Sequence, residues 1–225
     1  MNRLTKIVYF GILILISVVQ LAQGNYILAA ILFVLTGFAL PTYEKREAKR
    51  RFYRAIRKLY VCVDLNAFIK EREYLVEQAL FKGAISTPLR LLTNIEAYYN
   101  GQRESVAIDL SSMPFDATYQ YWIDCYISLC DVSHVARMRI SSQFNQVPRY
   151  YREIASQRFE VLLLMQKLQE GCAVDTNEIE ALRERVTPNL LVAELTQCLG
   201  NNTQNARIQK YYEQAALNLS KGLKI

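Results

Sequence analysis

Hydrophobic positions crowd the start of the chain in two runs, at residues 7–22 and 26–40, and no charged residue occurs from 7 to 43. The break between the runs, at residues 23–25, contains Gly24 and suits a tight turn. Each run with its flanks has about 16–19 residues, close to the lower limit for a helix that spans roughly 30 Å of hydrocarbon. The pattern therefore predicts a transmembrane helical hairpin over residues 1–43.

A cleaved signal peptide is the main competing interpretation of the first run. Residues 1–6 would form its basic region and residues 7–22 its apolar region. The segment Gln20-Leu21-Ala22 does not carry small residues at both cleavage positions, and a second apolar run follows at once. We therefore expect the segment to be retained. Because both arms are short, a re-entrant wedge confined to one leaflet stays open as an alternative.

The distribution of charge predicts the orientation of the hairpin. The net charge is +6, but residues 1–60 hold ten bases and two acids, whereas residues 61–225 hold seventeen bases and nineteen acids. Arg3 and Lys6 precede the first run, eight bases follow the second, and the turn carries no charge. Both termini are therefore expected in the cytoplasm, with the plasma membrane as the expected location. Basicity confined to a membrane flank argues against a nucleic-acid partner.

The basic segment after the second run predicts a juxtamembrane helix over residues 44–63. It contains good helix formers and no helix breaker. Phe52, Ala55, Ile56 and Leu59 form an apolar strip along it. The bases are expected at the membrane surface, where anionic lipid headgroups attract each one by about 1 kcal/mol. These bases are Lys45, Arg46, Lys49, Arg50, Arg51, Arg54, Arg57 and Lys58.

Residues 64–225 predict a cytoplasmic domain made only of helices, because apolar positions recur at helical spacing and no segment alternates like a strand. The expected start signals are Thr-Pro at 87–88 and at 187–188, with Asp116 and Asp175 as further caps. The expected stop signals are the glycines at 83, 101, 171, 200 and 222. We expect helices at 44–63, 66–82, 88–100, 103–112, 116–130, 133–145, 148–170, 176–186, 188–199 and 203–221. The predicted fold class is all-α, with antiparallel helix pairs following the transmembrane hairpin.

Residues 95–108, with Gly101 at their centre, have the composition of two helices joined by a tight turn. Residues 121–148 have Asp131 at a turn, Ala136 five positions later and Pro148 at the end. These two segments resemble tetratricopeptide repeats, although the first has one residue too many between Gly101 and Ala107. The resemblance covers about 55 residues. It implies a degenerate tetratricopeptide-like stack that binds proteins.

Catalytic and metal-binding motifs are missing from the sequence. His134 is the single histidine, and the five cysteines lack the spacing of a zinc site or disulfide framework. No phosphate-binding glycine loop, dinucleotide-binding motif or nucleophile elbow occurs. We therefore expect no metal, no cofactor and no enzyme activity. A thiol enzyme that uses Cys125 or Cys130 with His134 and Asp131 is the less favoured alternative.

Arginines and tyrosines supply the candidate binding residues. No acid occurs from residue 132 to 152, so the arginines there form an electropositive patch if the helices around Pro148 pack together. Such a patch suits an acidic peptide, a phosphate or a carboxylate terminus. A solvated face, or pairing with Glu153 and Glu160, is the simpler alternative. Most of the fifteen tyrosines suit the core, but doublets place neighbours on different faces. The candidates are Arg137, Arg139, Arg149, Arg152, Tyr150 and Tyr151.

These features together predict a membrane-anchored adaptor whose cytoplasmic helical domain binds a protein or peptide partner. Tethering would raise the local concentration of that partner at the membrane. The alternative is an accessory subunit of a transport, secretion or envelope-assembly complex, packed through its transmembrane hairpin. The sequence leaves the partner and the oligomeric state open.

Overall fold

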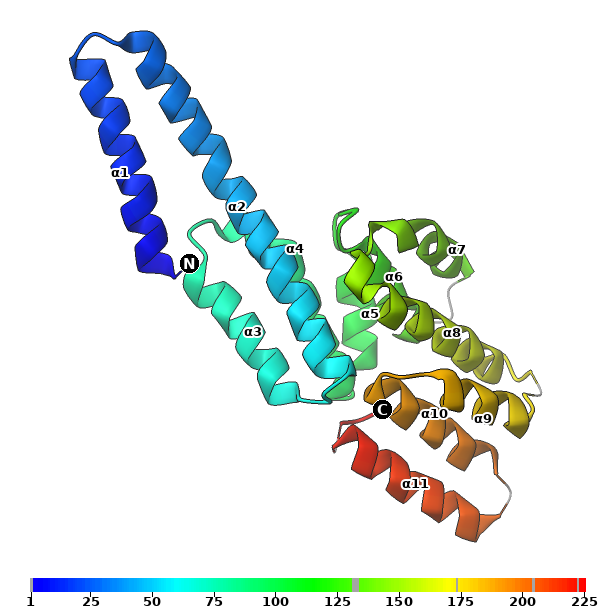
Figure 1. The fold of residues 1–225 in the computed structure, drawn as a ribbon. Helices are drawn as coiled ribbons and strands as arrows, with labels where there is room; N and C mark the ends of the chain where they lie inside the picture. Colours follow the sequence, from blue (N-terminus) through cyan, green and yellow to red (C-terminus); the bar gives the residue numbers. More distant parts are fainter. Residues whose placement is uncertain (1, 131–133, 173, 204, 222) are drawn as a thin grey trace.

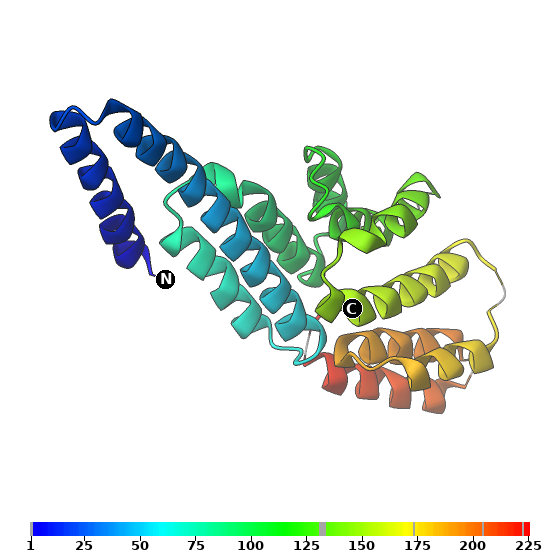
Figure 2. The ribbon, with the colours of Figure 1, turned by 45° about the horizontal axis from the view of Figure 1, so that its top comes forward.

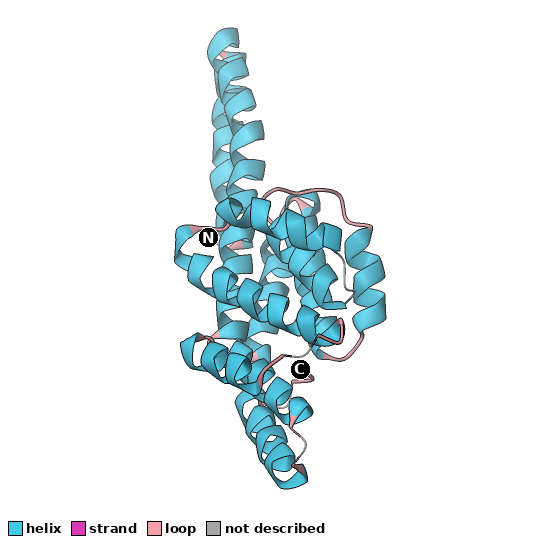
Figure 3. Ribbon diagram, turned by 90° about the vertical axis from the view of Figure 1, so that its right-hand side faces the viewer, coloured by secondary structure: helices cyan, strands magenta, loops and turns pink. Residues whose placement is uncertain are grey.

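A computed structural model describes residues 2–130, 134–172, 174–203, 205–221 and 223–225, with only the backbone described at 134–138. Over these ranges all regular structure is helical and no strand occurs (Figure 3), which confirms the all-α prediction. The elements in chain order are α1 (Arg3–Ala22), α2 (Tyr26–Tyr60), α3 (Leu65–Gln78), α4 (Lys82–Tyr99), α5 (Arg103–Ser111), α6 (Gln120–Cys130), α7 (His134–Gln143), the 3₁₀ turns η1 (Phe144–Gln146) and η2 (Arg149–Tyr151), α8 (Arg152–Gln169), α9 (Thr176–Arg185), α10 (Asn189–Asn202) and α11 (Ala206–Ser220).

Helix α1 and the first half of α2 form a hairpin that projects from the other helices (Figure 1, Figure 2). Gly24 closes its turn with φ +80°, a left-handed conformation that glycine adopts without steric cost. Both helices are long and apolar enough to cross a membrane, and most of their large apolar side chains are exposed. The prediction of two candidate spans is thus confirmed, while their orientation stays a prediction.

Helix α2 runs without a break from the second apolar run into the basic segment. Pro41 lies inside the helix, where its missing N–H removes the hydrogen bond that the carbonyl of Gly37 would accept. The predicted apolar strip of Phe52, Ala55, Ile56 and Leu59 is fully buried in the core of the helical domain. One continuous helix therefore joins the candidate membrane segment to that core.

The boundary between α3 and α4 differs from the sequence prediction, which placed Gly83 at a helix end and Pro88 at a helix start. Gly83 lies in the first turn of α4 and Pro88 in its interior. The chain reverses earlier because the Glu44 carboxylate on α2 accepts the N–H groups of Leu80 and Phe81, at 2.8 and 2.7 Å. A side chain 36 residues away in the sequence thus caps this turn. No motif in the local sequence predicts this cap.

Other predicted start and stop signals have mixed outcomes. Asp175 caps α9 as predicted, since its carboxylate accepts the N–H of Asn177 at 3.1 Å. Gly101 and Gly171 follow α4 and α8 with φ of +89° and +73°, as predicted.

Gly200 was expected to end a helix, but α10 continues to Asn202. A Cβ at Gly200 would lie 3.3 Å from that of Tyr212, so the glycine allows α10 and α11 to pack closely. The predicted stop at Gly222 lies outside the described residues.

Two more helix starts were predicted too early, and a third is shifted by one residue. Asp116 was expected to cap a helix directly, but its carboxylate accepts the N–H of Thr118 and forms a turn, so α6 begins at Gln120. The helix predicted from Pro148 begins as the 3₁₀ turn η2 and becomes α8 at Arg152. Pro188 stands one residue before α10.

Aromatic side chains dominate the core where α2, α4 and α6 meet. Trp122 is fully buried, with ring centroids 5.7 Å from Tyr60 and 5.3 Å from Tyr121. Both members of the doublet Tyr98-Tyr99 are buried, whereas Tyr150 and Tyr211 are exposed in the other two doublets. Core packing accounts for the buried tyrosines because a buried aromatic ring removes a large apolar area from water.

A buried ion pair crosses the same core. Arg158 on α8 donates from Nη1 to the Oε2 atom of Glu194 on α10, and both side chains are almost completely buried. The hydroxyl of Tyr99 donates to the other carboxylate oxygen at 3.2 Å. The Nε and Nη2 atoms of Arg158 have no hydrogen-bond partner among the described residues. The pair therefore links α4, α8 and α10 through one carboxylate.

Candidate binding groove

The structure describes the side chains of five of the six predicted binding residues, and their contacts differ from one another. The side chain of Arg137 lies outside the described residues. Arg139 reaches the buried Asp124 carboxylate, with Nη2 3.2 Å from Oδ1. Burial raises the pKa of Asp124, and hydrogen bonding to Gln120 and the charge of Arg139 only partly offset the effect. Arg139 thus forms an ion pair with a buried acid.

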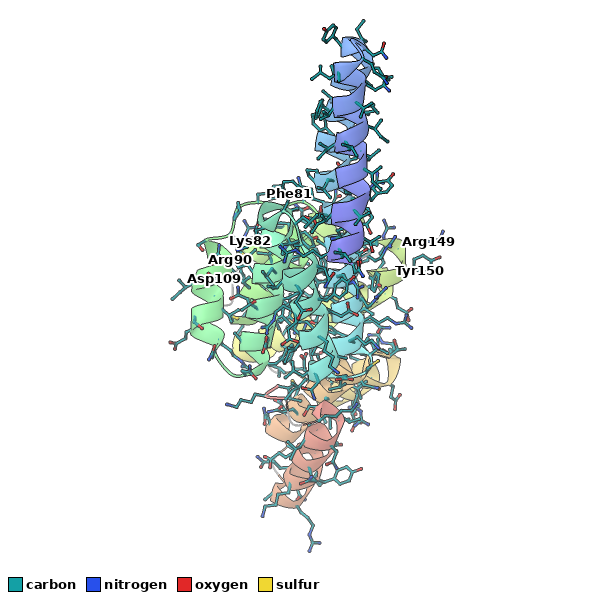
Figure 4. All side chains as sticks on the ribbon, turned by 90° about the vertical axis from the view of Figure 1, so that its left-hand side faces the viewer. Phe81, Lys82, Arg90, Asp109, Arg149 and Tyr150 are labelled. Carbon is teal, nitrogen blue, oxygen red and sulfur yellow. The ribbon has the colours of Figure 1, made fainter. Side chains whose placement is uncertain are left out.

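The other predicted binding residues also have separate environments. Arg152 donates from Nε to the carbonyl of Val147 at 3.1 Å and so braces the turn before α8. Tyr151 packs on Tyr53 with ring centroids 4.8 Å apart. Tyr150 is 95% exposed, and Figure 4 shows it beside Arg149. Among the members of the predicted set whose side chains the structure describes, Arg149 and Tyr150 therefore stay available to a partner.

A groove that the sequence did not reveal lies between α3, α4 and α5. Its volume is about 750 Å³. Its apolar lining comes from Val76, Ile85, Leu89 and Ala97, and polar side chains stand around it. Val76 is exposed and Leu89 is half-buried, so apolar surface remains open to solvent here. A pocket of this size and lining suits a few side chains of a bound segment.

Charged residues on one wall of the groove are held in place. The Arg90 guanidinium donates from Nε to Oδ2 of Asp109 at 2.9 Å and also contacts the hydroxyl of Ser112. Hydrogen bonds from Arg90, together with one from Asn94, lower the pKa of Asp109 although burial opposes the shift. The carboxylate is therefore charged at neutral pH, and the pair fastens α5 to α4.

One end of the groove lies close to the foot of the hairpin. Lys82 lines the groove and directly follows Phe81, whose N–H group bonds to Glu44 on α2. Lys82 is exposed, and among the described residues no acid pairs with its ammonium group. In Figure 4, Phe81, Lys82, Arg90 and Asp109 follow one another along one side of the domain, away from the hairpin tip. The groove thus offers an open positive charge at the end that lies near the foot of the hairpin.

The sequence contained one usable signal for this groove. A hairpin centred on Gly101 places Arg90, eleven positions before it, opposite Ser112, eleven positions after it, and the structure brings the two into contact. The apolar lining could not be recognised because its spacing on α4 is the same as that of core positions.

Cys125, one of the two candidate thiols, lies in an environment that is unfavourable for a nucleophile. Burial raises the pKa of Cys125 to about 12, so its thiol is protonated at neutral pH and is a poor nucleophile. Asp131 and the side chain of His134 lie outside the described residues. Across the described ranges, no group of three or more His, Cys, Asp or Glu side chains could hold a metal ion.

Comparisons of the chain with protein-family models, with curated proteins and with solved structures find no match. The function proposed below therefore rests on the chain's own geometry.

Proposed function

We propose that the chain is a membrane-anchored adaptor that binds a short segment of a partner protein in the groove between α3, α4 and α5. The hairpin crosses the membrane with both termini in the cytoplasm, and the helical domain is a degenerate tetratricopeptide-like stack. The observation that carries the proposal is an apolar groove with a fixed charged wall, beside the foot of two candidate membrane spans.

The groove suggests what kind of segment binds. Its apolar lining favours a segment with two or three large apolar side chains, because each buries surface that is otherwise in water. Lys82 favours an acidic side chain on the membrane-proximal side of that segment. The Arg90–Asp109 pair presents both a donor and an acceptor at fixed positions, which suits specificity more than affinity. An amphipathic, acidic segment therefore fits best.

Site-directed photo-crosslinking in native membranes tests the proposal. A photoreactive phenylalanine analogue replaces Thr93 in the groove, and a control chain carries it at the exposed Gln214 on α11. We expect a discrete protein adduct only from position 93. Lys82→Glu and Ala97→Trp should abolish it, whereas Lys210→Glu on α11 should not. An adduct that survives both groove variants, or one that contains only lipid, contradicts the proposal.

The proposed topology is tested separately. A reporter that is active only in the cytoplasm should work at the C-terminus and fail when inserted at Gly24 in the hairpin turn. Replacing residues 3–43 with an unrelated hairpin of equal length should leave the position-93 adduct intact. Its loss would instead favour an accessory subunit packed through its own hairpin.

A further inference from the structure

A second cavity lies at the foot of the hairpin, on the face of α4 opposite to the groove. Its volume is about 380 Å³. Lys45, Arg46 and Lys49 of α2 line one wall, and Gly83 and Thr87 of the first turns of α4 line another. Asp116 contributes a carboxylate from the loop before α6. Three elements therefore enclose a space that carries more positive than negative charge.

The three bases that line this cavity are unpaired. On the neighbouring face of α2, Arg51 forms ion pairs with Glu47 and Glu71 at 3.0 and 2.8 Å. Over the part of the chain that the structure describes, no acid lies within ion-pair distance of Lys45, Arg46 or Lys49. Asp116 uses its Oδ1 atom to accept the N–H of Thr118 at 2.9 Å. The protein thus leaves three cations facing one cavity without a counter-charge at contact distance.

The position of the cavity relative to a bilayer can be worked out from Glu44. Its carboxylate pairs with Lys6 of α1 at 3.1 Å and accepts the N–H groups of the turn before α4, so all three segments meet where the uncharged hairpin ends. Lys45 and Lys49 then follow within about 8 Å along the helix axis, at 1.5 Å per residue. The polar layer of a bilayer extends about 5–7 Å beyond the hydrocarbon on each side. In a bilayer that the hairpin spans, the cavity would therefore lie level with the lipid headgroups.

We propose that this cavity binds the phosphate of an anionic phospholipid headgroup. Lysine and arginine form charge-assisted hydrogen bonds with phosphate oxygens, and arginine can do so with two at once. Gly83 presents its backbone without a side chain, and a Cβ there would meet no atom within 4 Å, so a headgroup can approach closely. The Thr87 hydroxyl offers a further donor. This site requires the hairpin to enter a membrane but does not depend on the adaptor groove.

Gly83 provides a matched pair of variants for the test. Its φ is not in the left-handed region and the space around it is open, so a larger side chain fits. Gly83→Glu places a negative charge in the cavity and, near a helix N-terminus, does not disfavour the helix. Gly83→Gln has nearly the same size without the charge. A second test set is the triple replacement of Lys45, Arg46 and Lys49 by glutamine, with Arg50, Arg57 and Lys58 replaced likewise as an equal-charge control.

The full chain is reconstituted in nanodiscs that contain phosphatidylcholine with one-fifth phosphatidylglycerol, and retained lipid is counted by native mass spectrometry. We expect Gly83→Glu to retain about tenfold less phosphatidylglycerol than Gly83→Gln. The triple cavity variant should likewise retain about tenfold less than the control triple, because each base near a membrane surface contributes substantially to headgroup attraction. Unchanged Trp122 fluorescence shows that each variant is folded.

Three results overturn the proposal. One is equal loss of phosphatidylglycerol in the cavity and control triples, which would show attraction to the whole basic helix. Another is equal retention by Gly83→Glu and Gly83→Gln. The third comes from adding inorganic phosphate at millimolar concentration: displacement of the retained lipid would identify soluble phosphate as the ligand of the cavity.

Discussion

Removing one partner of the buried Arg158–Glu194 pair tests how the helical domain is held together. Arg158→Met keeps most of the side-chain volume but leaves the Glu194 carboxylate buried with only the Tyr99 hydroxyl as a donor. Burial lowers the pKa of Arg158, but attraction to the Glu194 carboxylate outweighs this effect and raises the pKa overall. The guanidinium is thus charged in the wild type, and its removal leaves an uncompensated charge.

The expected magnitude follows from the burial of both groups. Breaking a buried pair by removing one partner costs about 3–5 kcal/mol, whereas replacing both partners by apolar groups of similar volume is often neutral. Arg158→Met should therefore lower the free energy of unfolding by about 3–5 kcal/mol. The double variant with Glu194→Met should recover most of this loss, because the buried carboxylate that the single variant leaves without its cation is then also removed. The Tyr99 hydroxyl then lacks its acceptor, which costs about 1 kcal/mol.

Urea unfolding of the full chain in detergent micelles provides the assay. Trp122 is the single tryptophan and lies in the same core, so its fluorescence reports this region directly. Lys167→Met is the matched control, since its ion pair with Glu178 is half exposed and is worth less than about 1 kcal/mol. If the double variant loses as much stability as the two single variants added together, the pair is not coupled and the reasoning is refuted.

Three further outcomes are expected. Lys6→Met should leave Glu44 buried without its cation, loosen the foot of the hairpin and raise hydrogen exchange at the Leu80 amide; unchanged exchange would contradict the contact. Because the pKa of Asp124 is raised in the folded state, the wild type should lose stability as pH rises through that pKa. The urea midpoint measured against pH shows this loss, and Asp124→Asn should make the midpoint less dependent on pH. A maleimide at neutral pH should label the exposed Cys62 and Cys172 in the folded chain, and the buried Cys125 only after unfolding, as peptide mass spectrometry would show.

Features that depend on neighbouring residues in the sequence were predictable. The two apolar runs, the turn at Gly24 and the apolar strip from Phe52 to Leu59 all follow from local composition and helical spacing. The glycine stops at 101 and 171 were also predicted, because a residue with positive φ after a helix is most often glycine. These features needed no knowledge of what packs against them.

Features that depend on distant residues were not predictable. The turn between α3 and α4 begins before Gly83 because Glu44 supplies its cap from another helix. Gly200 allows close packing with Tyr212 and does not end α10. Arg139, one member of the expected arginine patch, pairs with a buried carboxylate that precedes it by fifteen positions. In each case a tertiary contact outweighed the local signal.

The first two turns of α4 line both of the sites proposed above. Lys82 and Ile85 face the groove, whereas Gly83 and Thr87 face the basic cavity, as a helical repeat of 3.6 residues requires for opposite faces. Glu44 fixes the start of this helix, so a substitution there would disturb both sites and could not separate them. Gly83 lines only the cavity and Ala97 lines only the groove. Because these two positions act on one site each, their variants can show whether lipid and partner bind independently or whether each changes the affinity for the other.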